Sequence, residues 1–202
     1  MTLSAFAINC TLKSSPTESS CERLLTQTLA EFERHGVKTE LLRAADYHIK
    51  PGVTSDEGEG DDWPEIRRKV LDADIFILGT PIWLGHPSSL CQRVLERLDA
   101  FLGEKDDAGR MVSYGRVAGV AVVGNEDGAH HVVADLFQGL NDVGFTLAAN
   151  ACTYWVGEAM QPGDFKDLPK TPDAVAQATA GFARNSVHLV NQLKQAQYPA
   201  QQ

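Results

Sequence analysis

The stretch DIFILG at residues 74–79 decides the fold, because its centre is continuously apolar and lacks the polar alternation of a half-exposed strand. Such a run is typical of a parallel strand that helices cover on both faces. A short helix is predicted before it, over residues 63–71. After it, apolar residues recur at helical spacing at Leu90, Val94, Leu95, Leu98 and Phe101. The stretch is therefore predicted to be a buried strand between two helices.

The same alternation extends along the chain in both directions. Further strands are expected over residues 3–8, 37–42, 117–123 and from about 145 to 153. Further helices are expected over residues 21–35, 129–143 and 174–195; the first carries an apolar stripe and ends at Gly36. Parallel strands need crossovers that are almost always right-handed. The order therefore predicts an α/β protein with a doubly wound, five-stranded parallel sheet of order 2-1-3-4-5.

Length, charge and cysteine content limit the possible classes. We expect residues 1–202 to form a single domain with a C-terminal helical extension. A net charge of −9 disfavours nucleic-acid and membrane partners, since both surfaces are anionic. The four cysteines show no metal-ligand or disulfide spacing, and neither a signal peptide nor a membrane span is recognisable, so a cytoplasmic protein is expected. The acidic residues 44–62 are predicted to form a solvated surface loop.

Sheets of this order bind ligands at the carboxyl ends of their strands, where the strand order reverses. The loops after the first, third and fourth strands should therefore form the site. The first loop, residues 9–20, offers Lys13, a helix N-terminus and the hydroxyls of Thr11, Ser14, Ser15, Thr17, Ser19 and Ser20. This set favours an anion, although an ordinary serine-rich turn fits it equally. No Walker A or G-x-G-x-x-G motif is present, which argues against ATPases and classical NAD-binding domains.

The second and third loops have a different character. The second, TPIWLGHP at residues 80–87, is apolar where a surface loop would be polar. Trp83 favours contact with a flat heteroaromatic ring, or else packing into the core or a subunit interface. The third, GNEDG at residues 124–128, has two glycines that permit close approach, and Asn125 can present its amide to a ring edge. Together the three loops predict a site for a phosphorylated planar cofactor such as FMN.

The motifs also resemble those of a known family. NCTLK at 9–13 with SS at 19–20, ADIFILGTPIWLGHPSSLCQRVLERLD at 73–99 and GNEDGAHH at 124–131 are similar to the flavin loops of NADPH-dependent FMN reductases and flavodoxin-like quinone reductases. The resemblance implies a flavodoxin-like three-layer sandwich that binds FMN. It assigns Thr11, Lys13, Ser19, Ser20 and Cys21 to the phosphate, Pro81, Ile82, Trp83, Leu84 and Gly85 to the isoalloxazine and ribityl groups, and Gly124, Asn125, Asp127 and Gly128 to the ring's other side. Cys10 replaces the family's usual glycine and Cys21 a common threonine, which leaves open whether the phosphate is held more weakly.

The resemblance further implies an FMN-dependent NAD(P)H oxidoreductase. In such enzymes hydride passes from NAD(P)H through the flavin to a small acceptor such as a quinone, and the subunits form a homodimer or homotetramer. A non-enzymatic FMN electron-transfer protein of flavodoxin type is the alternative. The aromatic pair Tyr154 and Trp155, with residues 157–172, either lines the substrate side or contacts a neighbouring subunit.

No catalytic side chain is assigned from the sequence. His86, His130 and His131 are proton-donor candidates only, because histidine titrates near neutral pH and surface histidines are common. Adjacent residues on a helix point about 100° apart, so His130 and His131 do not readily share one ion. No metal site is expected.

Overall fold

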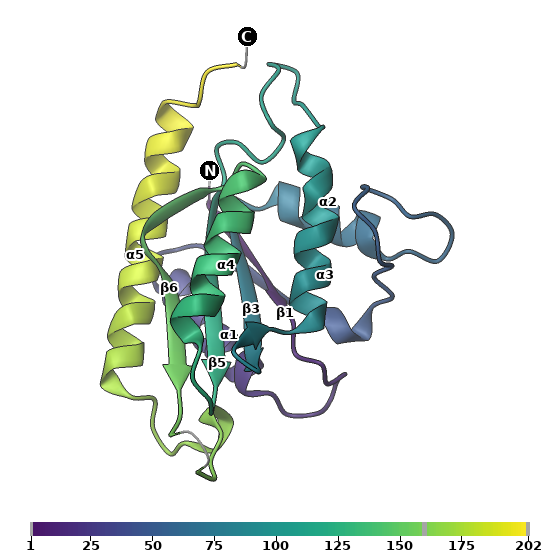
Figure 1. The fold of residues 1–202 in the computed structure, drawn as a ribbon. Coiled ribbons are helices and arrows are strands. Elements are labelled where there is room, and N and C mark those ends of the chain that lie inside the picture. Colours follow the sequence, from purple (N-terminus) through teal and green to yellow (C-terminus); the bar gives the residue numbers. More distant parts are fainter. Residues whose placement is uncertain (1, 159–160, 201–202) are drawn as a thin grey trace.

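The computed structural model describes residues 2–158 and 161–200. Its central sheet has five parallel strands in the order β2-β1-β3-β5-β6 (Figure 1). These are β2 (Lys38–Arg43), β1 (Ser4–Asn9), β3 (Ile75–Trp83), β5 (Val117–Gly124) and β6 (Thr146–Val156). The predicted order 2-1-3-4-5 is confirmed, because the remaining strand, β4 (His86–Pro87), pairs antiparallel with the end of β3 and lies off this path.

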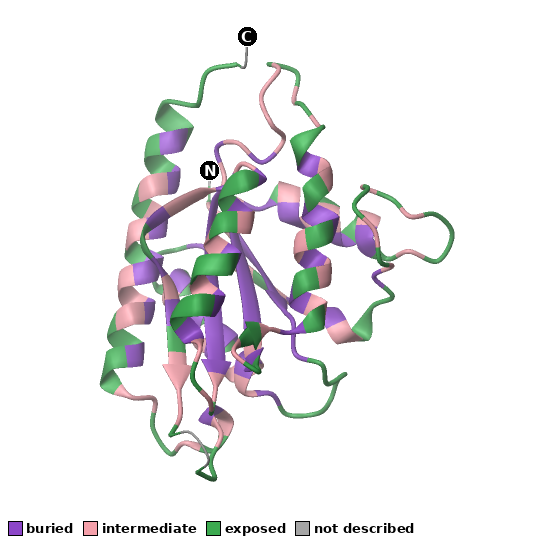
Figure 2. Ribbon diagram, in the orientation of Figure 1, coloured by how far each residue is buried: buried purple, intermediate pink, exposed green. Residues whose placement is uncertain are grey.

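Helices cover both faces of the sheet and give three layers. One face carries α1 (Ser20–Arg34) and α5 (Asp173–Gln195); the other carries α2 (Trp63–Asp72), α3 (Ser89–Leu98) and α4 (Ala129–Asp142). Short 3-10 turns lie at Ala44–Asp46, Asp99–Leu102 and Phe165–Asp167. Figure 2 shows the strands buried between the helical layers. None of the helices in the described residues has the length and apolar character needed to cross a bilayer.

The predicted apolar stripe of α1 packs on the sheet. Leu24, Leu25 and Phe32 are fully buried and Leu29 nearly so. Gly36, with φ of 75°, follows the helix in the left-handed conformation that commonly ends a helix. Gly79 of β3 lies beneath this helix, and a Cβ there would come within 2.4 Å of Leu25 Cδ1. The close approach of α1 to β3 therefore requires glycine at this position.

The third strand is longer than its sequence pattern indicates. The prediction ended it at Gly79, whereas β3 continues to Trp83 and reverses into β4. Leu84 and Gly85 form the turn, with φ of 52° and 77°. Positive φ at both central residues is the requirement of a type I′ hairpin turn. Part of the second predicted loop is therefore a hairpin.

The prediction of a solvated loop over residues 44–62 is wrong at both ends of that segment. Ile49 is buried, and the Asp61 carboxylate is fully buried against Arg97 of α3, with 2.8 Å between Asp61 Oδ2 and Arg97 Nη2. Arg97 also donates to the carbonyl oxygens of Lys50 at 2.9 Å and Thr54 at 3.0 Å. A buried charge needs such partners, so this arginine anchors the acidic segment to the core.

Candidate functional site

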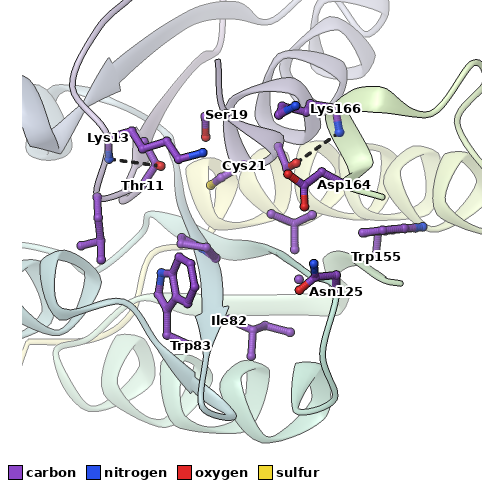
Figure 3. Close-up of a pocket in the computed structure, with 15 residues that line it drawn as sticks. Thr11, Lys13, Ser19, Cys21, Ile82, Trp83, Asn125, Trp155, Asp164 and Lys166 are labelled. Carbon is purple, nitrogen blue, oxygen red and sulfur yellow. Dashed lines mark hydrogen bonds between the residues drawn. The ribbon is translucent and has the colours of Figure 1, made fainter. Parts of the chain in front are cut away.

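An open cleft lies where the carboxyl ends of β1, β3 and β5 meet. It encloses about 630 Å³, including open solvent at its mouth. Figure 3 shows the hydroxyl and lysine side chains on one side of it and Trp83 and Ile82 on the other. Its described lining comprises Thr11, Leu12, Lys13, Ser19, Ser20, Cys21, Pro81, Ile82, Trp83, Val123, Gly124, Asn125, Trp155, Asp164 and Lys166.

The N-terminus of α1 forms the polar end of the cleft. Ser19 is the N-cap, and its Oγ accepts a hydrogen bond from the Glu22 amide at 3.3 Å. The Thr11 hydroxyl accepts from the Lys13 amide at 3.5 Å, and the Ser20 hydroxyl accepts from the Lys166 amide at 3.1 Å. Each hydroxyl acts as an acceptor in these bonds and so keeps its proton to donate. With the positive end of the helix dipole, they form an arrangement that is suited to an anion.

The two cations nearest this end differ in availability. The Lys13 ammonium forms no ion pair with any residue that the structure describes. The Lys166 ammonium lies 2.7 Å from Asp167 Oδ1, and this hydrogen bond raises the pKa of Lys166. Lys13 is thus the cation that is free to meet a bound phosphate.

Arg43, at the end of β2, holds the first loop in shape. Its Nη1 donates to the carbonyl oxygens of Lys13 at 3.3 Å and Thr17 at 2.8 Å, and its Nη2 pairs with the Glu22 carboxylate. The side chain is buried and its charge is neutralised by Glu22. Arg43 is therefore a positioning residue for the loop. No local pattern in the sequence points to Arg43, since its partners lie 21–30 residues earlier in the chain.

Cys10 in the first loop and Cys21 in the first turn of α1 are buried neutral thiols. Burial raises the pKa of Cys10 well above its ordinary value, and a hydrogen bond with Cys91 raises it further. Burial likewise raises the pKa of Cys21, with Cys91 contributing in the same direction. A protonated thiol carries no charge and does not repel an anion. The replacement of glycine and threonine by these cysteines therefore adds no electrostatic penalty to phosphate binding.

Pro81, Ile82 and Trp83 form the apolar wall opposite. Ile82 is buried, whereas the Trp83 side chain is 54% exposed at the rim. Behind this wall, Ser88 donates from its Oγ to the Cys10 carbonyl at 2.6 Å, and its amide donates to Thr80 Oγ1 at 3.0 Å. These buried bonds tie the hairpin to the first loop and fix the distance between the two sides of the cleft.

The third loop contributes Gly124 and Asn125 to the cleft, as the sequence suggested. Gly85 and Gly128 lie outside the described lining and contact each other instead: a Cβ on Gly128 would stand 2.8 Å from Gly85 Cα. Leu84 and Asp127 also lie outside it, the latter accepting a 2.7 Å bond from the Gly128 amide. These four predicted residues shape the loops around the site.

One wall of the cleft comes from the segment whose role the sequence leaves open between the substrate side and a subunit contact. Asp164 and Lys166 reach it from the connection between β6 and α5, whose position is fixed by Arg23 Nη1 donating to the carbonyl oxygens of Phe165, Lys166 and Leu168. Trp155, left open between two roles, lines the cleft because β6 runs past its predicted end at residue 153. The sequence names this segment as one that lines the substrate side or contacts another subunit, but it does not single out Asp164 or Lys166.

The described lining contains no histidine. His130 Nε2, on α4, lies 2.9 Å from the hydroxyl of Tyr154 in β6. Neither these two residues nor His86 and His131 reach the cleft. The structure therefore offers no support for a histidine proton donor at the site, and no catalytic side chain is assigned.

FMN fits this donor set. A hydroxyl-lined helix N-terminus with a free lysine suits its phosphate, and a proline, isoleucine and tryptophan wall suits one face of its ring. Fold and cleft together define a flavodoxin-like flavoprotein. A family model for NADPH-dependent FMN reductases matches residues 5–161, and the chain belongs to this family. It is thus a flavin-dependent oxidoreductase whose cofactor is FMN, and the family name gives NADPH as the co-substrate.

Two relatives and one solved structure match most of this chain. The chain is 31% identical over 98% of its length to the 8-demethyl-8-aminoriboflavin-5'-phosphate synthase of Streptomyces davaonensis, of which it covers 81%. It is 40% identical over 78% of its length to a protein named divalent metal cation transporter MntH of Mycobacterium bovis, but spans only 24% of that protein. Among solved structures, RosB with a bound 8-demethyl-8-formylriboflavin-5'-phosphate intermediate superposes with a TM-score of 0.87 at 28% identity, covering 97% of this chain and 82% of that one.

Proposed function

We propose that this protein is an FMN-dependent NAD(P)H oxidoreductase that passes reducing equivalents to a small acceptor such as a quinone. The observation that carries the proposal is the cleft itself, whose anion-binding end and aromatic end face each other within the segment matched by the family model. FMN, when bound, supplies the electron transfer between nicotinamide and acceptor. We further propose that residues 1–202 form one FMN-binding domain with a C-terminal helical extension.

The roles of the chain's own residues follow from their positions. Thr11, Lys13, Ser19 and Ser20 would bind the phosphate through hydroxyl donors, one cation and the start of α1. Cys21 would close this end as a neutral contact. Both cysteines are compatible with a tightly held phosphate, because their thiols stay protonated.

The hairpin and third loop would hold the ring system. Pro81, Ile82 and Trp83 exclude water from one side, and Asn125 offers an amide donor and acceptor at the edge. Leu84, Gly85, Asp127 and Gly128 would act indirectly, by fixing the two loops against each other.

A homodimer or homotetramer is part of the proposal. Leu12, Trp83 and Leu84 are 49%, 54% and 88% exposed beside the cleft. Large apolar side chains gathered at one place on a surface are typical of a surface that another chain covers. A cytoplasmic location is proposed from the four free cysteines, since reducing compartments keep thiols unpaired.

The test is an absorption spectrum of the purified protein with FMN, taken without oxygen before and after NADH or NADPH. Bleaching of the bound flavin, followed by steady-state oxidation of the nicotinamide with a quinone, azo, nitro or ferric acceptor, supports the reductase. Bound flavin that no nicotinamide bleaches would leave the electron carrier of flavodoxin type. Failure to retain FMN would overturn both.

Chemistry on the flavin itself is a second candidate, favoured by the 31% identity to the aminoriboflavin phosphate synthase over nearly the whole chain. The mass of the flavin extracted after incubation distinguishes the two. A reductase returns FMN of unchanged mass, whereas a flavin-modifying enzyme returns a product of different mass. Incubations with and without the nicotinamide separate reduction from modification.

A further inference from the structure

Three side chains of types that can ligate a metal ion meet outside the cleft, between the hairpin and α4. They are His86, in β4, and His131 and Asp135, one helical turn apart on α4; the atoms through which they could bind an ion all lie within 4.8 Å of one another. Figure 1 shows α4 beside the end of β3, where the hairpin turns. All three side chains are exposed.

The geometry of the three residues suits coordination. His131 Nε2 and Asp135 Oδ2 are 3.4 Å apart. Two ligand atoms held at about 2.0–2.1 Å by a tetrahedral zinc ion are about 3.3 Å apart, so this pair already has the required separation. The rings of His86 and His131 stand edge to face, with centroids 5.0 Å apart. The third ligand is His86. Rotating exposed side chains so that its ring nitrogen moves about 1.5 Å closer gives the separation that a tetrahedral ion requires.

The neighbouring backbone holds the triad together. The contact between Gly85 and Gly128 sets the hairpin directly against the first turn of α4. His130 faces Tyr154 instead, with 2.9 Å between Nε2 and the hydroxyl, so it is not a member of the triad. Adjacent residues on a helix point in different directions, so His130 and His131 do not bind the same ion, as the sequence indicated. His86 supplies the second imidazole from the hairpin instead.

We propose that His86, His131 and Asp135 bind a divalent transition-metal ion of the zinc class. Two neutral imidazoles and one carboxylate suit zinc, cobalt or nickel, whereas calcium and magnesium prefer oxygen ligands throughout. The ion joins the hairpin that carries Trp83 to helix α4 and keeps at least one coordination position open to solvent. The site revises the expectation of no metal, and it does not depend on the proposed reductase activity.

The test is a calorimetric titration of the tag-free, FMN-loaded protein with zinc chloride. One ion per chain should bind to the wild type. Removing a residue that only hydrogen-bonds to a metal ligand already weakens metal binding roughly 10- to 100-fold. Removing a ligand itself, as in His86→Ala, His131→Ala and Asp135→Ala, should therefore weaken zinc binding at least about tenfold. His130→Ala is the matched control, because it removes an exposed histidine from the same turn, and its affinity should equal that of the wild type.

Two further measurements separate the triad from other binding. Cobalt-loaded protein should show the visible absorption of a cobalt ion with nitrogen ligands, and His131→Ala should abolish it. Excess calcium should not displace zinc; displacement would place the ion at an all-oxygen site such as the acidic segment around residues 55–62. The proposal is overturned by wild-type protein that binds no zinc stoichiometrically, or by triad variants that bind it as tightly as His130→Ala does.

Discussion

Replacing Lys13 by alanine should weaken FMN binding through the phosphate alone. The ammonium is exposed and has no ion-pair partner among the described residues, so its removal leaves no uncompensated charge in the free protein. Hydrogen bonds to charged groups contribute about 1.5–3 kcal/mol, and an exposed lysine belongs at the lower end. We expect a loss of roughly 1.5 kcal/mol, which is about a tenfold rise in Kd.

The assay compares FMN with riboflavin, which lacks the phosphate, by calorimetry or by quenching of flavin fluorescence. Lys13→Ala should weaken FMN binding but leave riboflavin binding unchanged, and added salt should narrow the difference from the wild type. Lys38→Ala is the matched control. Lys38 carries the same charge but lies at the start of β2, at the amino ends of the parallel strands, whereas the cleft lies at their carboxyl ends. Equal losses for both ligands would mean that the variant distorts the cleft. Unchanged FMN affinity would place the phosphate elsewhere and refute the assignment.

Three further predictions concern the framework of the site. Asp61→Asn should lower the free energy of unfolding in urea by about 3–5 kcal/mol, because it leaves the buried Arg97 charge uncompensated. Burial alone would raise the pKa of Asp61, but Arg97 and backbone amides outweigh it and hold the pKa below its usual range. The stability that the Asp61 carboxylate contributes is therefore present above its unfolded pKa of about 3.9 and is lost as the pH falls below that value. The Tm of the wild type should accordingly fall on acidification through this range, and the part of the fall due to Asp61 should be absent in Asp61→Asn. Leu84→Asn should raise the free energy of unfolding by about 0.5–1 kcal/mol, since asparagine tolerates the φ of 52° better than leucine does; an unchanged or lower value would show that the turn is unstrained. Because burial raises the pKa of Cys10 and Cys21, iodoacetamide near neutral pH should alkylate these two thiols only after denaturation. Rapid alkylation of either cysteine in the native protein, detected by mass spectrometry, would contradict this.

The layers of the fold were predictable because their signals are local. A continuously apolar strand and stripes such as Leu24 to Phe32 depend only on residues within one element. The end of β3 was not predictable in the same way. Thr80-Pro81 indicates a strand end, because proline donates no hydrogen bond to a sheet, yet Pro81 stays in register with Val123 of β5. Support from the neighbouring strand outweighs the local preference.

The polar end of the cleft was visible in the sequence only in part. Ser19 and Lys13 lie in a loop whose composition indicates an anion site, and the strand order places it correctly. The contribution of Lys166 depends on a bond to Ser20 across 146 residues, and that of Arg43 on bonds to Lys13 and Thr17 across 30 and 26 residues. Such contacts arise from packing between elements, which no local pattern records.

The hairpin links the two features that sequence reasoning left incomplete. Helical geometry correctly separates His130 from His131 and leaves His131 facing a different neighbour. Identifying that neighbour required knowing that the chain reverses after Trp83, because only the reversal brings His86 beside α4. The same reversal sets Trp83 at the rim of the cleft and moves Gly85 out of its lining. A strand end misplaced by four residues therefore accounts both for the position of Leu84 and Gly85 outside the described lining and for the unrecognised histidine and aspartate cluster.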